Sequence, residues 1–408
     1  MAVKNEGDVW LVAITAGRWQ RHGIVEARKA GLKVVAIDSD PDAEGFQDAD
    51  KRICVDTNDY EGVIDALQSL DIPIRGAVSF CSEAGMLLAA HVREAFNLPG
   101  PRQALSRSLI DKGIQRRVWE KAGVPSPRFR TFTSRRAVLA AIPLFGFPSI
   151  IKPTDTSGSR GVTKLESIQD DLGGAVDRAF SFAKSGEVVL EDCMVGTEFT
   201  VEVFCMRGVV NVLAISEKKK VSGTRGTVAR ELATPDRPSE VLGRIADAVS
   251  NAFVALGYLE GPGHAEAILM EDERVGLVEV AGRGGGFMVF DKFVPLVSGV
   301  NIARLTAQQA VGMTLSPFKS LAKAAVLRFF PTQPGILRAV HGFDEANKVP
   351  GVEAGCFVKP GVSFGQAMAD GDRLGYVLSC AETVAEAQRR ADLAENKVIF
   401  DFAPPRGP

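Results

Sequence analysis

The chain has 408 residues and a mass of 43.6 kDa, which at roughly 100–200 residues per domain predicts two or three domains. Hydrophobic residues make up 46% of the chain and charged residues 24%, and this composition excludes a disordered chain, a coiled coil and a collagen-like repeat. The net charge of −2 gives no overall field that would attract nucleic acid or an anionic membrane.

No stretch of the sequence reaches the ~18–20 consecutive apolar residues that cross a bilayer. The longest apolar stretch, residues 140–151, is interrupted by Pro143, Gly146 and Pro148. The first eight residues, MAVKNEGD, lack the basic and apolar regions of a signal peptide. The six cysteines form no Cys-x-x-Cys pair, and we expect reduced, mostly buried thiols. These observations predict a cytoplasmic protein without a membrane or nucleic-acid partner.

Strands and helices alternate through the first hundred residues. The predicted strands cover residues 8–15, 32–38, 51–55 and 75–80. The predicted helices between and after them cover residues 19–30, 60–70 and 83–96. This alternation is typical of a doubly wound parallel sheet, which binds ligands beyond the carboxyl ends of its strands.

The first turn of this predicted sheet lacks the glycines of a dinucleotide site. Gly17 and Gly23 are the glycines there, and they do not form G-x-G-x-x-G. Asp38 ends the second strand where a dinucleotide fold has its ribose acceptor, but without the glycines this is a weak signal for nicotinamide or flavin.

The pattern changes after residue 98, where LPGPR precedes a polar helix over 107–122 that ends at Gly123. A second module has predicted strands at 128–132, 147–152, 161–165 and 187–192, and helices near 134–141 and 167–184. Antiparallel strands follow at 198–205 and 209–215, and a last helix covers 381–396. We therefore predict boundaries at 1–105, 106–127, 128–190 and 191–408.

Residues 150–162, IIKPTDTSGSRGV, bring a lysine from a strand into a loop of serine, arginine and glycine. Glycine lets backbone N–H groups turn toward an anion, and Lys152 offers a point charge for a phosphate oxygen. The G-K-[ST] end of a Walker A loop is missing. The alternative interpretation is a flexible hairpin that binds nothing.

Glu266 and Glu279 lie on either side of a predicted hairpin whose loop covers residues 271–274. The predicted cross-strand pairs are Met270 with Val275, Ile268 with Leu277, Glu266 with Glu279, and His264 with Ala281. Two carboxylates that face each other repel, so in a cleft either one would be protonated or a cation would lie between them. Oxygen ligands favour Mg²⁺ or Mn²⁺ as that cation. The alternative is a hairpin whose glutamates face water.

Three further segments carry chemistry. Arg283, beside a glycine run, is placed to hold a carboxylate or a transferring phosphoryl group. Glu191 and Glu198 could accept hydrogen bonds from a nucleotide. Residues 216–232, rich in lysine and arginine, are expected to line the substrate entrance and to favour an anionic substrate. For each segment, the alternative is an ordinary solvated surface.

Seven motifs in order give the sequence a wider resemblance. They are SEAGMLLAA (82–90), DK (111–112), AGVPSP (122–127), IKP with its Gly/Ser loop (151–161), E-x6-E (191–198), HAE (264–266) and EVAGRGGG (279–286). In this order they resemble the ATP-grasp family, in the branch of biotin carboxylase, carbamoyl-phosphate synthetase and the amino-acid and carboxylate–amine ligases. The resemblance covers nearly the whole chain. It implies a mixed α/β and α+β fold with an N-terminal doubly wound parallel sheet, a small mobile ATP-lid domain and a C-terminal mixed or antiparallel sheet domain.

The resemblance also implies roles for individual residues. The residues that would hold ATP phosphates are Lys112 and Lys152. The loop that would close over the phosphates comprises Ser157, Gly158, Ser159, Arg160 and Gly161. The hinge along the adenine would comprise Glu191, Asp192, Cys193 and Met194. The ribose ligand would be Glu198, the metal ligands Glu266 and Glu279, and the catalytic residues Arg283 and Lys152. Ala281 departs from the family, which often has Asn there, so that either His264 or water would complete the metal shell.

The function that the resemblance implies is an ATP-dependent ligase with ATP and Mg²⁺ or Mn²⁺ as cofactors. It would activate a small carboxylate, such as an amino acid, as an acyl-phosphate and join it to an amine, releasing ADP and phosphate. One alternative is a biotin carboxylase-like or purine-biosynthesis carboxylating or formylating enzyme. Another is a non-catalytic nucleotide-binding regulatory protein. A homodimer is an arrangement that the resemblance leaves open.

Overall fold

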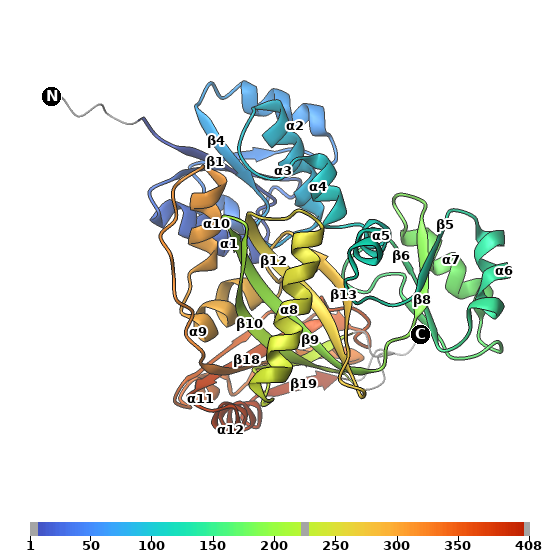
Figure 1. The fold of residues 1–408 in the computed structure, drawn as a ribbon. Coiled ribbons are helices and arrows are strands. Elements are labelled where there is room, and N and C mark those ends of the chain that lie inside the picture. The colour runs from blue at the N-terminus through green and yellow to red at the C-terminus, as the bar shows by residue number, and fades with distance from the viewer. Residues whose placement is uncertain (1–6, 222–227, 404–408) are drawn as a thin grey trace.

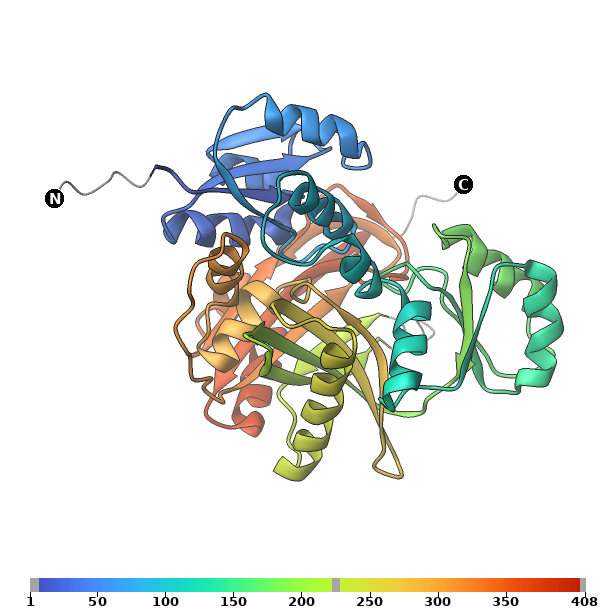
Figure 2. The ribbon, with the colours of Figure 1, turned by 45° about the horizontal axis from the view of Figure 1, so that its top comes forward.

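The computed structural model describes residues 7–221 and 228–403, which form four sheets with helices packed around them (Figure 1). The N-terminal sheet lies above the central sheet, and a smaller lobe that carries β5 to β8 projects to one side of both (Figures 1 and 2). This arrangement confirms the predicted ATP-grasp fold class, with a parallel sheet at the N-terminus and antiparallel sheets elsewhere.

The N-terminal sheet is parallel, with strand order β3-β2-β1-β4. Its strands are β1 (Trp10–Ile14), β2 (Lys33–Asp38), β3 (Lys51–Cys54) and β4 (Ile74–Val78). The helical elements are α1 (Arg18–Lys29), η1 (Glu44–Asp48), α2 (Tyr60–Gln68) and α3 (Ala84–Ala95). Every residue of β1 is buried, as expected for a strand covered by helices on both faces of its sheet. The predicted elements of this region are therefore confirmed.

The connecting helix predicted over residues 107–122 is wrong, because two helices are present. These are α4 (Gln103–Ser108) and α5 (Lys112–Ala122). The side chain of Asp111 accepts a hydrogen bond from the backbone N–H of Ile114, at 2.9 Å, and so begins a new helix. Gly123 ends α5 in the left-handed conformation. The cap places Lys112 at the first position of α5.

The projecting lobe contains an antiparallel sheet of order β5-β8-β6-β7. Its elements are β5 (Phe129–Phe132), α6 (Arg135–Phe145), β6 (Ser149–Pro153), β7 (Thr163–Leu165), α7 (Leu172–Phe182) and β8 (Val188–Asp192). The helix predicted over 167–184 begins later, because Asp170 accepts hydrogen bonds from the backbone N–H groups of Glu166 and Ser167 and holds a turn there. Asp171 then caps α7.

The central sheet has eight strands in the order β13-β12-β9-β10-β11-β14-β18-β16. They are β9 (Gly196–Met206), β10 (Val209–Lys220), β11 (Ala229–Ala233), β12 (Gly261–Met270), β13 (Val275–Ala281), β14 (Ala324–Pro331), β16 (Val352–Cys356) and β18 (Arg373–Ala381). The solvated loop considered for residues 216–232 is wrong where the structure describes them, since β10 and β11 belong to this sheet. Residues 222–227 lie outside the described part of the chain.

The remaining elements pack around the central sheet. They are α8 (Ser239–Ala255), the π-helical turn η2 (Val289–Phe293), α9 (Val294–Ser298), α10 (Ile302–Ala310), α11 (Phe343–Ala346), α12 (Val384–Glu395), and a small sheet of β17 (Ser363–Phe364), β15 (Gly335–His341) and β19 (Ile399–Ala403). Helix α8 packs on β10, β12 and β13, and α12 on β14 and β18. One apolar core contains residues of the N-terminal sheet, α10 and the central sheet. This shared core fixes the three parts relative to one another.

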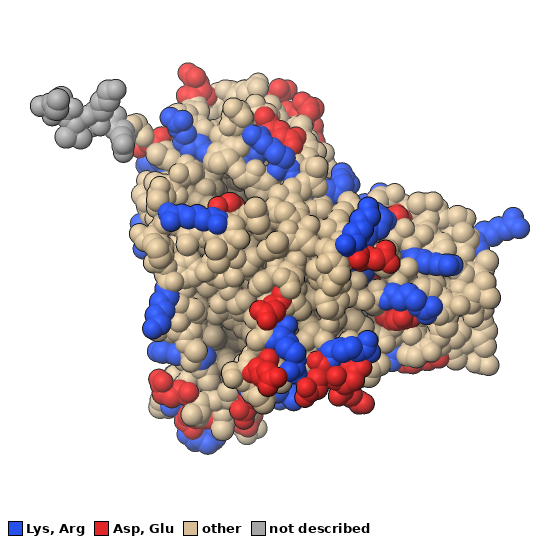
Figure 3. Space-filling view, in the orientation of Figure 1, with Lys and Arg blue, Asp and Glu red and all other residues tan. Residues whose placement is uncertain are grey.

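On the face drawn in Figure 3, basic and acidic side chains are intermingled, so that face presents no large patch of one sign.

All six cysteines are free, but only Cys205 is buried, so the expectation of mostly buried thiols is wrong. Within the described residues, no helix is long and apolar enough to cross a membrane.

Leu277 tests the packing of the hairpin that carries the predicted metal ligands. Its side chain is fully buried in the core under α8. Leu277→Ala should lower the free energy of unfolding by about 2–5 kcal/mol, because the substitution leaves a cavity. Val209→Ala is the control, since Val209 is 59% exposed. Urea unfolding measures both, and a loss for Leu277→Ala no larger than the control's would contradict this placement.

Candidate active site

The two central glutamates face each other across β12 and β13. The structure pairs Glu266 with Glu279 and His264 with Ala281, which confirms those two predicted pairs. The other two predicted pairs are wrong, because Val275 faces Leu269 and Leu277 faces Ala267.

Two departures from a regular hairpin cancel each other. The turn is one residue shorter than predicted, because the Met270 N–H donates to the Arg274 carbonyl at 2.9 Å and Glu273 adopts a left-handed conformation. Val278 is then an extra residue on β13, a β-bulge between Ala267 and Glu266. The Arg116 guanidinium donates to the Val278 carbonyl at 2.7 Å. The bulge restores the register, and the two carboxylates lie opposite each other.

Each of these carboxylates forms an ion pair with a lysine. Lys112 Nζ lies 2.6 Å from Glu279, and Lys218 Nζ lies 2.9 Å from Glu266. Burial alone would raise the pKa of Glu279, but Lys112, Lys152 and Arg283 more than offset it and lower the pKa to about 2. Burial would likewise lower the pKa of Lys112, but Glu279 and Glu83 raise it above its ordinary value. Glu279 is therefore ionised at neutral pH.

Lys218 also joins this pair to the predicted ribose ligand. Its ammonium lies 2.6 Å from Glu198, and Lys220 lies 2.5 Å from the same carboxylate. Burial opposes ionisation of Glu198, yet the two lysines lower its pKa to about 2. A single buried lysine on β10 thus holds both Glu198 and Glu266.

Lys152 and Glu191 belong to a second buried cluster. Lys152 Nζ lies 2.5 Å from Glu191, and the fully buried Arg116 donates to the same carboxylate at 2.9 Å. Burial, with the nearby charge of Arg116, lowers the pKa of Lys152, although Glu191 opposes this. Within the described residues the Glu191 carboxylate therefore faces two cations. Its neighbours Asp192, Cys193 and Met194 are partly exposed.

Arg283 is held by a carboxylate from the N-terminal part of the chain. Its guanidinium lies 2.6 Å from Glu83, and a second nitrogen donates to the Gly284 carbonyl. The glycine run that follows is needed for packing, since a Cβ on Gly284 would lie 1.9 Å from the Phe290 ring. The N–H of Gly285 donates to Glu202, and Glu202 also pairs with His264.

The Gly/Ser loop is exposed and has the backbone that its composition predicts. Gly158, Ser159 and Gly161 all have positive φ angles. The loop is connected to α5, because Lys112 Nζ donates to the Thr156 carbonyl at 2.8 Å. The loop therefore lies beside the lysine that neutralises Glu279.

A cavity of about 570 Å³ gathers many of these residues. The predicted site residues that line it are Ser157, Gly158, Ser159, Arg160, Glu266, Glu279 and Arg283. Predicted site residues outside its lining are Lys112, Lys152, Gly161, Glu191, Asp192, Cys193, Met194 and Glu198. Of these, Lys112 and Glu198 are joined to the lining through the ion pairs described above. The assignment of each residue to phosphate, adenine, ribose or metal stays a prediction.

Several lining residues were not predicted. They include Glu83, Trp19, Phe287, Phe329 and Arg373. Of these, Glu83 lies in the motif at 82–90. Lys218 also lines the cavity, and it belongs to the segment 216–232 that was expected at the substrate entrance. Asp38, considered as a ribose acceptor, instead accepts a hydrogen bond from the Ala16 N–H at 2.6 Å and ties β2 to the first turn.

The donor set fits a hard divalent ion. Among the described residues no group of three His, Cys, Asp or Glu side chains is placed to hold a metal. Mg²⁺, however, is commonly bound by one or two carboxylates with phosphate oxygens and water. Glu266 and Glu279 are directly opposed, and each draws a lysine in this structure. Because each carboxylate attracts a positive charge, the position between Glu266 and Glu279 suits a divalent cation.

The sequence matches two families of known domains. Residues 145–291 match the ATP-grasp domain, and residues 328–403 match the L-amino acid ligase C-terminal domain 2. The chain thus contains an ATP-grasp domain, and its fold is the one that the sequence predicted. The second match covers a separate, shorter segment at the C-terminal end of the described residues.

Individual relatives extend over nearly the whole chain. An uncharacterized protein, y4rH, of Sinorhizobium fredii is 27% identical over 406 residues, 97% of this chain and 83% of the relative. A formate-dependent phosphoribosylglycinamide formyltransferase of Burkholderia lata is 25% identical, covering 94% of this chain and 93% of the relative. The L-amino acid ligase structure from Bacillus licheniformis has a TM-score of 0.83 at 22% identity, covering 97% and 99% of the two chains. At this identity the structural likeness shows the fold.

Lys152 tests whether the buried lysine cluster belongs to the nucleotide site. Lys152→Ala should weaken ATP binding by about 10- to 100-fold, because it removes a charge-assisted contact worth about 1.5–3 kcal/mol. Titration calorimetry with ATP and Mg²⁺ measures the affinity. Lys164→Ala, at an exposed lysine of β7, should change nothing. Equal ATP affinity of wild type and Lys152→Ala would remove this lysine from the site.

The low pKa of Glu198 predicts how pH acts on stability. Since its folded pKa of about 2 lies below the ordinary 4.5, its ion pairs contribute fully above about pH 4.5 and are lost as pH falls toward 2. The unfolding free energy of Glu198→Gln should therefore lie below that of wild type at about pH 6, with a smaller gap at about pH 4. Urea unfolding at both pH values measures the gap.

Glu240→Gln is the matched control, since its side chain is 86% exposed on α8. It should show little difference from wild type at either pH. A gap for Glu198→Gln that stays constant or grows at low pH would contradict the assigned ion pairs.

Proposed function

We propose that the protein is an ATP-dependent ligase that joins a small carboxylic acid to an amine. The carboxylate oxygen attacks the γ-phosphorus of ATP and ADP leaves, which gives an acyl-phosphate. The amine nitrogen then attacks the acyl carbon, the amide bond forms, and phosphate leaves with the C–O bond electrons. The amine loses its proton to solvent or to the departing phosphate.

The observation that carries this proposal is the opposed pair Glu266 and Glu279 in a cavity that also contains Arg283 and the Gly/Ser loop. Phosphoryl transfer needs little covalent chemistry from a protein, but it needs positioning and stabilisation of charge. This cavity combines an anion-binding loop, an arginine and a carboxylate pair suited to a divalent ion. A dehydrogenase or a hydrolytic triad would need other groups.

The chain's own residues have distinct tasks in this scheme. Glu266 and Glu279 would hold Mg²⁺, which neutralises charge on the phosphoryl oxygens. Lys112 and Lys152 bind phosphate oxygens as point charges. Arg283, held in place by Glu83, orients the substrate carboxylate. The Gly/Ser loop excludes water, since water would hydrolyse the acyl-phosphate and waste ATP.

Two observations favour an amino acid as substrate. Residues 328–403 match the L-amino acid ligase C-terminal domain 2. The cavity also has aromatic and apolar walls, from Trp19, Phe287 and Phe329, which suit an apolar side chain. A formylating or carboxylating enzyme remains the second candidate because of the relative from Burkholderia lata. A test with formate and bicarbonate separates the two candidates.

A direct assay tests the proposal against a non-catalytic nucleotide-binding protein. The purified chain is incubated with ATP, Mg²⁺ and pairs of amino acids, with formate or bicarbonate in parallel, and phosphate release and product mass are followed. We expect phosphate release that requires both substrates, with an amide product lighter than the pair by one water. ATP binding without phosphate release over the whole panel would favour the regulatory protein instead.

Glu279→Gln tests the metal pair within this scheme. The substitution keeps the size of the side chain but removes its charge, so ligation should fall by at least about 100-fold, corresponding to ~3 kcal/mol of transition-state stabilisation. Adenine binding should largely persist. Glu273→Gln, at the exposed turn of the same hairpin, is the control and should keep full activity. Turnover of Glu279→Gln within a few-fold of wild type would show that the metal assignment is wrong.

A further inference from the structure

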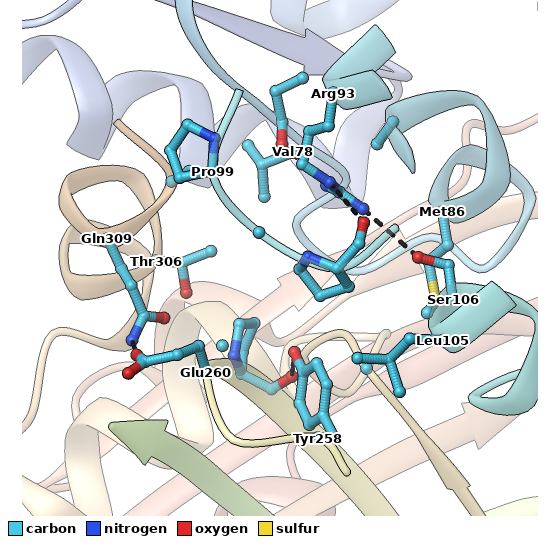
Figure 4. A pocket seen from close by; sticks show the side chains of 18 of the residues that line it. Val78, Met86, Arg93, Pro99, Leu105, Ser106, Tyr258, Glu260, Thr306 and Gln309 are labelled. Atoms are coloured by element: carbon cyan, nitrogen blue, oxygen red, sulfur yellow. Dashed lines mark hydrogen bonds between the residues drawn. The ribbon is translucent and has the colours of Figure 1, made fainter. Parts of the chain in front are cut away.

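A second cavity, of about 600 Å³, is drawn in Figure 4, and segments that line it continue into the lining of the first cavity. It is enclosed by the end of β4, by α3, α4 and α10, and by segments 99–102 and 257–262. Its walls are largely apolar, with Val78, Met86, Leu105 and Tyr258 among them. A cavity of this size and lining is typical of a site for a small organic ligand.

Arg93 brings a positive charge to this apolar cavity. Its side chain comes from α3 at the upper edge of the view, and the residue is only 8% exposed (Figure 4). Its guanidinium donates to the Pro101 carbonyl at 2.8 Å, to the Ala77 carbonyl at 2.9 Å and to the Ser106 hydroxyl at 3.4 Å. All three acceptors are neutral. Among the described residues, no carboxylate forms an ion pair with Arg93.

A buried charge with neutral partners only is unusual, because taking it out of water is costly unless an opposite charge lies nearby. A guanidinium has five N–H donors, and the three hydrogen bonds to described residues leave two for another acceptor. Burial, together with the charge of Arg102, lowers the pKa of Arg93 to about 10, although Tyr258 and Glu94 oppose this. The local field therefore favours an anion.

The other charged residues around the cavity fit this reading. Arg102 donates to the Arg93 carbonyl and to Asn97, so its guanidinium adds to the positive charge at the same end. Glu260 is the acidic residue among those that line the cavity, and its two oxygens already accept from the Arg207 N–H and the Gln309 side chain. The N–H groups of Arg93 that remain for another acceptor thus lie at the cationic end of the cavity.

We propose that this cavity is an effector site for a small organic monocarboxylate. The carboxylate would accept the spare N–H groups of Arg93, and the apolar body would lie against Val78, Leu105 and Tyr258. The binding part of this proposal is independent of the proposed ligase activity, and only its effect on turnover rests on that function.

The wall between the two cavities gives the effector a route to the active site. Ser79 and Gly282 line the second cavity, while Glu83 and Arg283, a few residues along the same two segments, line the first. The Ser79 hydroxyl donates to the Ser82 carbonyl at 2.7 Å. A ligand that moves Ser79 or Gly282 therefore also moves the Glu83–Arg283 ion pair. Occupancy of the second cavity should change the substrate affinity or turnover of the first.

Titration calorimetry with hexanoate tests the binding. Hexanol carries the same chain without charge, and hexylamine carries the opposite charge. We expect hexanoate to bind at least tenfold more tightly than either control. Equal binding of hexanol, or no binding of hexanoate at millimolar concentration, would overturn the proposal.

Variants locate the site. Arg93→Met keeps an apolar stem without charge, and Leu105→Trp fills the cavity from the half-buried face of α4. Each should weaken hexanoate binding at least tenfold while ATP binding, which also reports correct folding, is kept. If Arg93→Met fails to fold, Leu105→Trp decides. Unchanged hexanoate affinity in Leu105→Trp would overturn the proposal.

Arg283→Ala separates the two cavities. Hexanoate should bind this variant as it binds wild type, because the effector site lies behind the wall. Loss of binding in Arg283→Ala, together with normal binding in Arg93→Met, would place hexanoate in the active site and overturn the proposal. For coupling, hexanoate should change the ATP affinity or the phosphate-release rate of wild type by at least a few-fold and leave Leu105→Trp unaffected. No change in wild type at saturating hexanoate would overturn the effector role.

Discussion

Two carboxylates, Glu266 and Glu279, are held opposite each other by the backbone of β12 and β13 at the centre of this molecule. Like charges at a directly opposed pair of strand positions repel, and burial makes the repulsion stronger. The protein offsets this cost with Lys112 and Lys218, one for each carboxylate. The hairpin is therefore stabilised by α5 and β10, which bring these lysines from distant parts of the chain.

The same ion pairs connect the parts of the active site. Lys218 forms ion pairs with both Glu198 and Glu266, so in the proposed enzyme a nucleotide contact at one carboxylate would be coupled electrostatically to a metal at the other. Lys112 also reaches the Thr156 carbonyl at the base of the Gly/Ser loop. In the proposed enzyme, phosphates and a divalent ion would take over part of this charge balance.

Local patterns in the sequence predicted much of the fold. The alternating strands and helices of the first hundred residues are fixed by hydrophobic period and turn residues, which are local properties. The helix over 107–122 was wrong because one capping side chain, Asp111, outweighed the continuous polar pattern. The opposed glutamates were predicted correctly although the hairpin was not regular, since the shorter turn and the bulge at Val278 shift the register in opposite directions.

Long-range ion pairs were beyond prediction from the sequence. The partners Lys218 and Glu266, or Glu83 and Arg283, lie 48 and 200 positions apart, and nothing local in the sequence joins them. Lys218 was assigned to a basic segment at the substrate entrance, and only the strand pairing of β10 shows that it is buried beneath the glutamates. Arg93 gave no signal at all, because its unusual feature is that it forms no ion pair with a carboxylate among the described residues.

The most direct measurement is a crystal structure with ADP and Mn²⁺, in which anomalous scattering locates the ion. The account predicts a peak within coordination distance of both Glu266 and Glu279 and of a polyphosphate oxygen, with Lys218 moved from Glu266 toward Glu198. An ion located elsewhere, with both glutamates still bound to their lysines, would contradict it.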